Sequence, residues 1–182
     1  VQAANQSRDT YGFTYVPEGA DAMRLYVETA LTGRDAGSML PFATIDRRTE
    51  QIVGSTRFHH VEFWDWPAGN PHQRGKQLPD VVYIGGTWLA ADAQRTGINP
   101  EAKLLMLTYA FESWRVHRVR IQADSRNERS RRAIMRLGAH LDGVVRADRA
   151  ALDGTIRDSA VYSFLDSEWP EVKAKLIGGQ AS

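Results

Sequence analysis

The chain has 182 residues, of which 42% are hydrophobic and 25% charged, and its formal net charge at pH 7 is +1. This composition is typical of a globular domain with a substantial core and excludes a disordered chain; no apolar run approaches the roughly 20 residues of a membrane-spanning helix. The length is that of one domain over residues 1–182, and we expect no membrane partner. The absence of cysteine excludes disulfides, thiolate metal ligands and a covalent cysteine intermediate, so we expect a cytoplasmic protein without a metal.

The chain opens with an irregular stretch and a helix. Residues 1–12 show no periodicity, so we expect a loose N-terminal tail. Asp21 is a typical N-cap and Gly33 a typical helix terminator, and apolar residues recur between them at helical spacing. These residues predict an amphipathic helix.

Two strands and a long loop follow. The segments Met39–Ile45 and Gln51–Phe58 flank the polar turn DRRTE and predict an antiparallel hairpin. Residues Glu62–Pro79 contain prolines and glycines without a regular period, which predicts a long loop. Within it, Trp64 and Trp66 could line an acceptor cleft, form a subunit contact in a homodimer, or pack under the turns of the loop itself.

A strand, a glycine turn and a helix occupy the middle of the chain. The apolar run from Val81 to Leu89 predicts a strand, in which Gly85 and Gly86 mark a bulge or a place where a ligand approaches the backbone. After Gly97, Asn99 suits the N-cap and Pro100 the first helical position. A core-facing stripe then recurs at Leu104, Leu107, Phe111 and Trp114.

The start of this central helix is a candidate anion site. Its unpaired backbone N–H groups and the helix dipole both favour a negatively charged ligand such as a phosphate. Glycine in such a loop is also ordinary turn chemistry, and the spacing alone does not decide between these interpretations.

A second strand and helix carry polar residues at an inward position. Alternation over His117–Asp124 predicts a strand, and the following helix ends at Gly138. Ser130 falls on the apolar stripe of this helix, and Asn127 lies one turn earlier on the same side. These two side chains are either capping groups or site residues, and spacing alone favours capping.

The last elements are a hairpin and a short helix. Val144–Arg149 and Thr155–Leu165 flank the turn signal Asp153-Gly154, and residues 167–176 predict a closing helix. The order of the elements predicts an α/β or α+β domain with a mixed sheet and a right-handed βα crossover.

Ten arginines lie between Arg115 and Arg149, against four acidic residues. They form either a solvated surface or a patch for a phosphorylated cofactor or a nucleic acid. Aromatic and basic residues are not interleaved as in single-strand binders, so we expect nucleic acid not to be the partner.

Two linked motifs resemble those of the GCN5-related N-acetyltransferase (GNAT) family. The family's cofactor loop Gln/Arg-x-x-Gly-x-Gly/Ala stands here as Gln94–Asn99, with Asn99 in the last small position. The family's Asn-x-x-Ser and closing Leu-Gly stand as Asn127, Ser130, Leu137 and Gly138. Further matches, at Trp88-Leu89, Tyr162-Ser163 and Glu168-Trp169, are similar to the branch of ribosomal-protein alanine acetyltransferases. The resemblance implies a mixed, mostly antiparallel sheet flanked by helices, with a βαβ cofactor-binding core; the family's usual first strand and helix, before Tyr11, are expected to be missing here.

The resemblance also implies roles for individual residues. Backbone amides would hold the pyrophosphate of coenzyme A, with added charge from Arg95; they belong to Gln94, Arg95, Thr96, Gly97, Ile98 and Asn99. Main-chain groups of Trp88 and Leu89 would meet the pantetheine arm, and the Leu89 amide would stabilise the thioester oxyanion. Asn127 would bind the same arm, and Ser130 would protonate the departing thiolate.

The expected reaction is acetyl transfer from acetyl-CoA to a primary amine. Without a cysteine, we expect direct attack of the amine on the thioester in a ternary complex. The acceptor is a protein N-terminal α-amine or a small-molecule amine; a non-catalytic CoA-binding or RNA-contacting module is the alternative. No residue stands out as the base, although His59, His60 and Glu62 follow the hairpin and could face the cleft.

Overall fold

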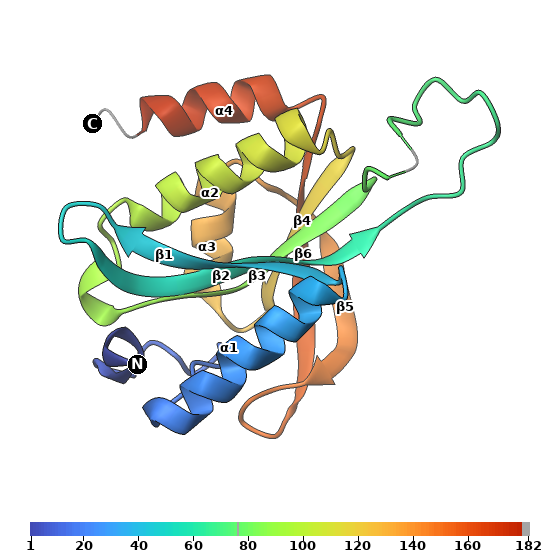
Figure 1. The fold of residues 1–182 in the computed structure, drawn as a ribbon. Coiled ribbons are helices and arrows are strands. Elements are labelled where there is room, and N and C mark those ends of the chain that lie inside the picture. Colours follow the sequence, from blue (N-terminus) through green and yellow to red (C-terminus); the bar gives the residue numbers. More distant parts are fainter. Residues whose placement is uncertain (76, 180–182) are drawn as a thin grey trace.

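The structure, a computed structural model, describes residues 1–75 and 77–179 and consists of a six-stranded sheet with helices on both faces (Figure 1). The strands are β1 (Met39–Asp46), β2 (Gln51–Glu62), β3 (Val81–Leu89), β4 (Arg118–Asp124), β5 (His140–Ala150) and β6 (Ile156–Leu165). The helices are α1 (Gly19–Asp35), α2 (Ile98–Thr108), α3 (Glu128–Arg136) and α4 (Trp169–Gly178). These bounds confirm the predicted order of helices, strands and hairpins. The N-cap of α1 is Glu18 in place of the predicted Asp21, and the helix continues two residues past its predicted end at Gly33.

The sheet is mixed and mostly antiparallel, as predicted. Its strand order is β1-β2-β3-β4-β6-β5, in which β3 and β4 run parallel and every other neighbouring pair is antiparallel. The parallel pair is connected through α2, since a parallel connection needs a crossover that a short turn cannot provide. None of the described helices is long and apolar enough to cross a membrane.

The core lies between the sheet and the helices α2, α3 and α4, while α1 covers the opposite face (Figure 1). Strand β2 shows the division, because Phe58 contacts the rings of Tyr109 and Trp114 beyond α2, whereas the neighbouring Arg57 stacks on Tyr26 of α1. The predicted stripe on α2 is confirmed: Leu107 and Phe111 are buried and Trp114 packs against the core. The last part of this helix is a π-helical turn over Tyr109–Ser113.

The expectation of a loose N-terminal tail is wrong for residues 1–12. Gln2–Asn5 form a short 3-10 helix, and Ala4 and Tyr11 are buried against Trp88 with Val16. The reason is apolar contact: Tyr11 packs edge-on against Trp88, with ring centroids 6.5 Å apart. Periodicity does not reveal this contact, because the segment docks as an irregular chain.

The long loop after β2 is anchored by its tryptophans. The Asp80 carboxylate accepts hydrogen bonds from the backbone N–H of Trp64 at 2.7 Å and from the indole N–H of Trp66 at 2.8 Å. The Trp64 ring also stacks on His117, with centroids 5.6 Å apart. The two indole rings also lie against one another, with centroids 5.5 Å apart, which supports packing within the loop. The acceptor cleft and the subunit contact stay predictions.

Candidate functional site

The parallel strands β3 and β4 separate at one end. They pair through Val81–Ile84 on β3 and Arg118–Ile121 on β4. Beyond these four pairs β3 continues to Leu89 and β4 to Asp124 without pairing to one another. A V-shaped opening therefore forms in the middle of the sheet, next to the start of α2.

A bulge bends β3 at this opening. Ser55 pairs with Trp88 and Arg57 with Gly85, so β3 carries one residue more than β2 over the same span. Gly86 in the bulge has a φ of +57°, and a Cβ placed there would lie 2.3 Å from Nε of Arg57. Only glycine fits this position without a shift, which confirms the predicted bulge.

A cavity of about 740 Å³ lies at the opening and brings the two predicted motifs together. Nine of the ten predicted site residues line it: Trp88, Leu89, Gln94, Arg95, Thr96, Gly97, Asn99, Asn127 and Ser130. The exception is Ile98, whose side chain packs against Val53, Ala90 and Ala93. We call this space the cofactor cavity, and the roles of its residues stay predictions.

Helix α2 begins earlier than the sequence predicted. Its N-cap is Gly97, with a φ of +85°, and not Asn99; no side chain caps the first turn. Glycine adopts this left-handed backbone without strain, so the chain turns into the helix two residues sooner. Asn99 and Pro100 therefore lie inside the first turn and line the cofactor cavity. The anion site predicted from the N–H groups of that turn stays a prediction.

Asn127 and Ser130 occupy the start of α3. Asn127 is its N-cap, and its amide oxygen accepts a hydrogen bond from the backbone N–H of Ser130 at 3.0 Å. Both residues also line the cofactor cavity. Capping and a place at the site thus coincide, because the cap uses the amide oxygen of Asn127 and leaves its NH₂ group available.

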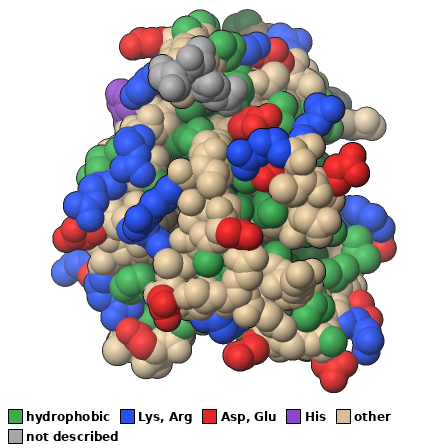
Figure 2. Space-filling model, turned by 90° about the vertical axis from the view of Figure 1, so that its left-hand side faces the viewer, with side chains coloured by type: hydrophobic (Ala, Val, Ile, Leu, Met, Phe, Trp, Pro, Cys, Tyr) green, Lys and Arg blue, Asp and Glu red, His purple; other side chains and the backbone are tan. Residues whose placement is uncertain are grey.

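The cofactor cavity is electropositive. Four basic side chains line it, from Arg95, Arg129, Arg136 and Lys175, and no acidic side chain does so among the residues described. Figure 2 shows the face on which α2 begins, where Lys and Arg side chains gather on one part of the surface. Such a wall favours a ligand with several negative charges.

The end of β3 presents main-chain groups to the same cavity. Because the N–H of Ala90 bonds to Val53 of β2 at 2.7 Å, antiparallel alternation directs the polar backbone groups of Leu89 away from β2. The Leu89 carbonyl accepts hydrogen bonds from Tyr11 Oη at 2.9 Å and Gln94 Nε2 at 3.0 Å. The indole N–H of Trp88 is buried without a partner among the residues described.

A smaller cavity of about 280 Å³ adjoins the first. Seven residues line both cavities, which therefore lie side by side at the opening of the sheet: Thr14, Thr87, Asn99, Asn127, Ser130, Ala133 and Leu137. We call the smaller one the inner cavity.

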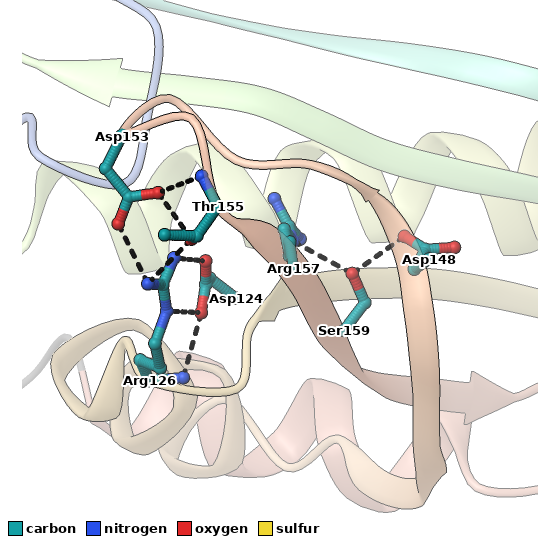
Figure 3. Close-up of polar contacts among 7 residues, drawn as sticks. All are labelled: Asp124, Arg126, Asp148, Asp153, Thr155, Arg157 and Ser159. Carbon is teal, nitrogen blue, oxygen red and sulfur yellow. Dashed lines mark hydrogen bonds and ion pairs between the residues drawn. The ribbon is translucent and has the colours of Figure 1, made fainter.

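Two charged residues on the walls of the inner cavity are held by the β5–β6 hairpin (Figure 3). The Asp124 carboxylate accepts hydrogen bonds from Arg126 at 3.0 and 2.8 Å, and this lowers the pKa of Asp124. Arg126 also bonds to Asp153 of the hairpin turn at 2.8 Å. Burial lowers the pKa of Arg157, and the nearby Arg149 lowers it further.

Lys103 is a site residue that sequence reasoning missed. It lies on α2, is only 4% exposed and lines the inner cavity. Burial lowers the pKa of Lys103 to about 7. The available signal was its position: Lys103 falls four residues before Leu107 and seven before Ala110, which places it on the buried face of α2.

The base candidates suggested by sequence lie elsewhere. His59 contacts His60 and Tyr83 on the α1 side of β2 and β3, and it lines neither cavity. Burial, followed by the charges of His60 and Arg57, lowers the pKa of His59 to about 4. His60 and Glu62 line a different hollow, over β5. These side chains therefore do not face the opening in the sheet.

The arginine-rich segment does not form one free surface. Arg126 is engaged with Asp124, Arg131 donates to Tyr162 at 3.1 Å, and Arg129 donates to the carbonyl of Thr10 at 2.8 Å. These guanidinium groups hold the fold together around the site. No group of acidic and histidine side chains suited to a metal ion occurs in the described part of the chain.

The chain is similar to a known protein family over most of its length. Residues 2–140 match the family model for the acetyltransferase (GNAT) domain. The chain is 37% identical over 163 residues to "Putative ribosomal N-acetyltransferase YdaF" of Bacillus subtilis, covering 90% of this chain and 73% of that protein.

Solved structures show the same fold. A GCN5-related N-acetyltransferase from Brucella melitensis superposes with a TM-score of 0.81 at 22% identity, covering 97% of this chain and 74% of that one. Mycobacterium smegmatis RimJ, solved in complex with CoA-disulfide, gives a TM-score of 0.70 at 20% identity, covering 88% and 69%. Because a family model matches most of the sequence and a relative exceeds one third identity, the chain belongs to the GNAT family and is an N-acetyltransferase.

Proposed function

We propose that this chain transfers the acetyl group of acetyl-CoA to the α-amine of a protein N-terminus, by direct attack while both substrates are bound. GNAT acetyltransferases use acetyl-CoA, and the family membership of the chain supports the donor. The proposal rests mainly on the cofactor cavity, because both sequence motifs line it. Its described walls carry four basic side chains and no acidic one.

The residues of the cofactor cavity fit coenzyme A. The free N–H groups that follow Gly97 suit a pyrophosphate, and Arg95 and Arg136 supply charge for the phosphates. The NH₂ group of Asn127, which has no partner among the residues described, suits the amide groups of a pantetheine arm.

Acetyl-CoA supplies an activated thioester, and residues at the opening would act on it. The Leu89 N–H, directed away from β2, is our candidate to stabilise the oxyanion that forms when an amine attacks. The Ser130 hydroxyl, which lines both cavities, is our candidate to protonate the departing thiolate.

Two arguments support an α-amine as the acceptor. The relative from Bacillus subtilis is described as a ribosomal N-acetyltransferase, so the N-terminus of a ribosomal protein is the first acceptor to test. An α-amine, with a pKa of about 7.7 to 8.0, is partly neutral at pH 7, whereas a lysine at about 10.4 is almost fully protonated.

The test is thiol release from acetyl-CoA in the presence of short peptides that begin with Ala or Ser. The matched controls are the same peptides with an acetylated N-terminus and an internal lysine, which offer only a side-chain amine. We expect release with the free N-termini alone, and intersecting lines in initial-rate plots because no acyl-enzyme forms. Parallel lines, or acetylation of the lysine alone, would refute the proposal.

A further inference from the structure

Lys103 is a buried lysine without an acidic partner among the residues described. Its ammonium nitrogen lies 3.0 Å from Thr56 Oγ1 and 2.9 Å from Thr87 Oγ1, and both contacts are to neutral hydroxyls. The two hydroxyls lie 2.8 Å apart and bond to one another. A charged ammonium has three N–H donors, whereas a neutral amine has two donors and a lone pair. The two hydroxyls satisfy both donors of the neutral amine and leave one N–H of the ammonium form without a protein partner among the residues described.

Thr87 connects this lysine to the reaction space. It lies on β3, one residue after the glycine bulge, and it lines both the cofactor cavity and the inner cavity. A hydroxyl can take part in three hydrogen bonds, and Lys103 and Thr56 account for two of them. One position on Thr87 Oγ1 therefore remains for a group in the cavity. Thr56 lines neither of these two cavities.

From this geometry we propose that Lys103, acting through the Thr87 hydroxyl, accepts the proton that the attacking amine must lose. The proposal rests on the acetyl transfer proposed above and adds to it a proton acceptor. It also explains why a lysine occupies a core position of α2, where an apolar residue would pack at no cost in desolvation.

The proton transfer balances as follows. The amine nitrogen forms a bond to the thioester carbon, the carbon–sulfur bond breaks, and the sulfur leaves as a thiolate. The surplus proton on nitrogen passes to Thr87 Oγ1 while the Thr87 hydroxyl proton passes to Lys103, which becomes an ammonium. The thiolate takes one proton, from Ser130 in our assignment. Lys103 then gives up its extra proton through Thr87 to the Ser130 alkoxide, and this restores the Ser130 hydroxyl and the neutral Lys103.

The charged and titratable groups around Lys103 leave it free to ionise in this way. Asp124 of β4, Arg157 of β6 and Tyr15 of the N-terminal segment share the inner cavity with it. On α2 itself, Glu101 is exposed. Burial is the one cause that lowers the pKa of Lys103, to about 7. A group with this pKa is partly neutral at physiological pH and can accept a proton.

The neighbouring strands contribute no charge on this side. Arg57 and His59 of β2, and Tyr83 of β3, lie toward α1 on the other face of the sheet, where they contact Tyr26 and one another. The Lys103 amine is therefore hydrogen-bonded to β2 and β3 through the neutral hydroxyls of Thr56 and Thr87.

The first experiment measures kcat against pH with acetyl-CoA and an Ala-starting peptide, for the wild type, Lys103→Met and Thr87→Val. Methionine and valine keep the packing volume. We expect kcat to fall about 10²-fold in both variants, and the acid limb near pH 7 to disappear. Thr87→Ser, which keeps the hydroxyl, should restore most of the rate and the acid limb. Thr56→Val should lose far less than Thr87→Val, because its hydroxyl does not reach the cavity.

Two results would overturn the role of Lys103. One is an acid limb that is the same in wild type and Lys103→Met, since it would then belong to the amine substrate. The other is Lys103→Arg with near wild-type kcat, because a guanidinium supplies charge but cannot accept a proton. Unchanged CoA affinity in Lys103→Met, measured by calorimetry, separates this loss from a disturbed cofactor cavity.

A second experiment is independent of the acceptor. The sequence has four lysines, Lys76, Lys103, Lys173 and Lys175, so NMR of the ε-¹³C-labelled protein gives few resonances, and Lys103→Met identifies the relevant one. We expect Lys103 to titrate near 7; titration near the ordinary value of about 10.4 overturns the proposal. If the wild type binds acetyl-CoA but acetylates no peptide, the proposed acceptor is wrong. The titration still shows whether Lys103 is able to accept a proton near pH 7.

Discussion

The amide oxygen of Asn127 accepts a hydrogen bond from the backbone N–H of Ser130 at 3.0 Å, while both residues line the cofactor cavity. One side chain therefore begins α3 and faces the ligand. Its two ends have separable tasks, because the oxygen caps the helix and the NH₂ group can donate to a ligand.

Substitution of Asn127 should separate these tasks. Asn127→Asp keeps the capping oxygen but loses the NH₂ donors, so we expect an unfolding free energy within about 0.5 kcal/mol of wild type and a CoA affinity at least tenfold weaker. Asn127→Ala should lose the cap as well, at about 1 kcal/mol. Urea denaturation and calorimetry measure the two quantities. Wild-type CoA affinity in Asn127→Asp would mean that the residue is a cap alone.

The basic wall of the cofactor cavity can be tested with two arginines of the same helix. Arg136 lines the cavity, whereas Arg132 pairs with Glu128 at 3.2 Å and does not line it. Arg136→Gln should raise the KM for acetyl-CoA several-fold at low salt, and the effect should shrink as salt screens the exposed charge. Arg132→Gln is the control and should leave KM unchanged. Equal effects of the two would point to general surface charge.

The docked N-terminal segment should contribute to stability. Tyr11 is 7% exposed and donates to the Leu89 carbonyl at 2.9 Å. Tyr11→Phe removes the hydrogen bond and should cost about 1 kcal/mol, whereas Tyr11→Ala also leaves a cavity beside Trp88 and should cost about 3 kcal/mol or more. Urea unfolding, followed by tryptophan fluorescence, measures both. A cost near zero for Tyr11→Ala would show that the segment is not packed in solution.

Acid stability should depend on Asp124. Hydrogen bonds from Arg126 lower the folded-state pKa of this buried carboxyl. A lowered folded pKa gives stability that is complete above the unfolded value of about 3.9 and is lost as the pH falls through the folded value. We expect the urea midpoint of the wild type to decrease as the pH is lowered below about 4. The midpoint of Arg126→Met should be lower than that of the wild type at neutral pH and should decrease less on acidification. Parallel curves for the two proteins would contradict the pairing.

Alkaline conditions should stabilise the fold through Lys103. Its pKa is about 7 in the folded protein and about 10.4 in an unfolded chain. Between these values the unfolded chain binds more protons, so the free energy of unfolding rises with pH across this window. Lys103→Met removes the slope and should be the more stable protein at pH 7. Urea midpoints from pH 6.5 to pH 10 test this, and a flat wild-type curve would contradict a buried neutral lysine.

The fold was predictable from sequence because most of its elements carry local signals. The 3.6-residue stripe on α2, the DRRTE and Asp153-Gly154 turns, and the alternation in β4 each depend on neighbours in the chain. Nine predicted site residues meet in one cavity because the two motifs occupy consecutive βα units. Their pairing in space follows from the parallel strands.

What the sequence did not reveal depends on contacts between distant segments. The Tyr11 ring packs against Trp88, which lies far along the chain, and such a contact produces no periodic pattern in the sequence. The early start of α2 follows from the left-handed backbone of Gly97, which composition alone does not fix. Lys103 was not predicted as a site residue because lysine usually lies on the exposed face of an amphipathic helix. Its spacing from Leu107 nevertheless places it on the buried face of α2.

The short ladder between β3 and β4 has a mechanical consequence. Four residue pairs are all that join a wing of three strands, β1-β2-β3, to a wing of three others, β4-β6-β5, within the sheet. A rotation of one wing against the other about this seam would widen or narrow the reaction space and leave every hairpin intact. We therefore expect substrate affinity to respond to substitutions at this seam, at residues such as Val82 and Val119 that line neither cavity.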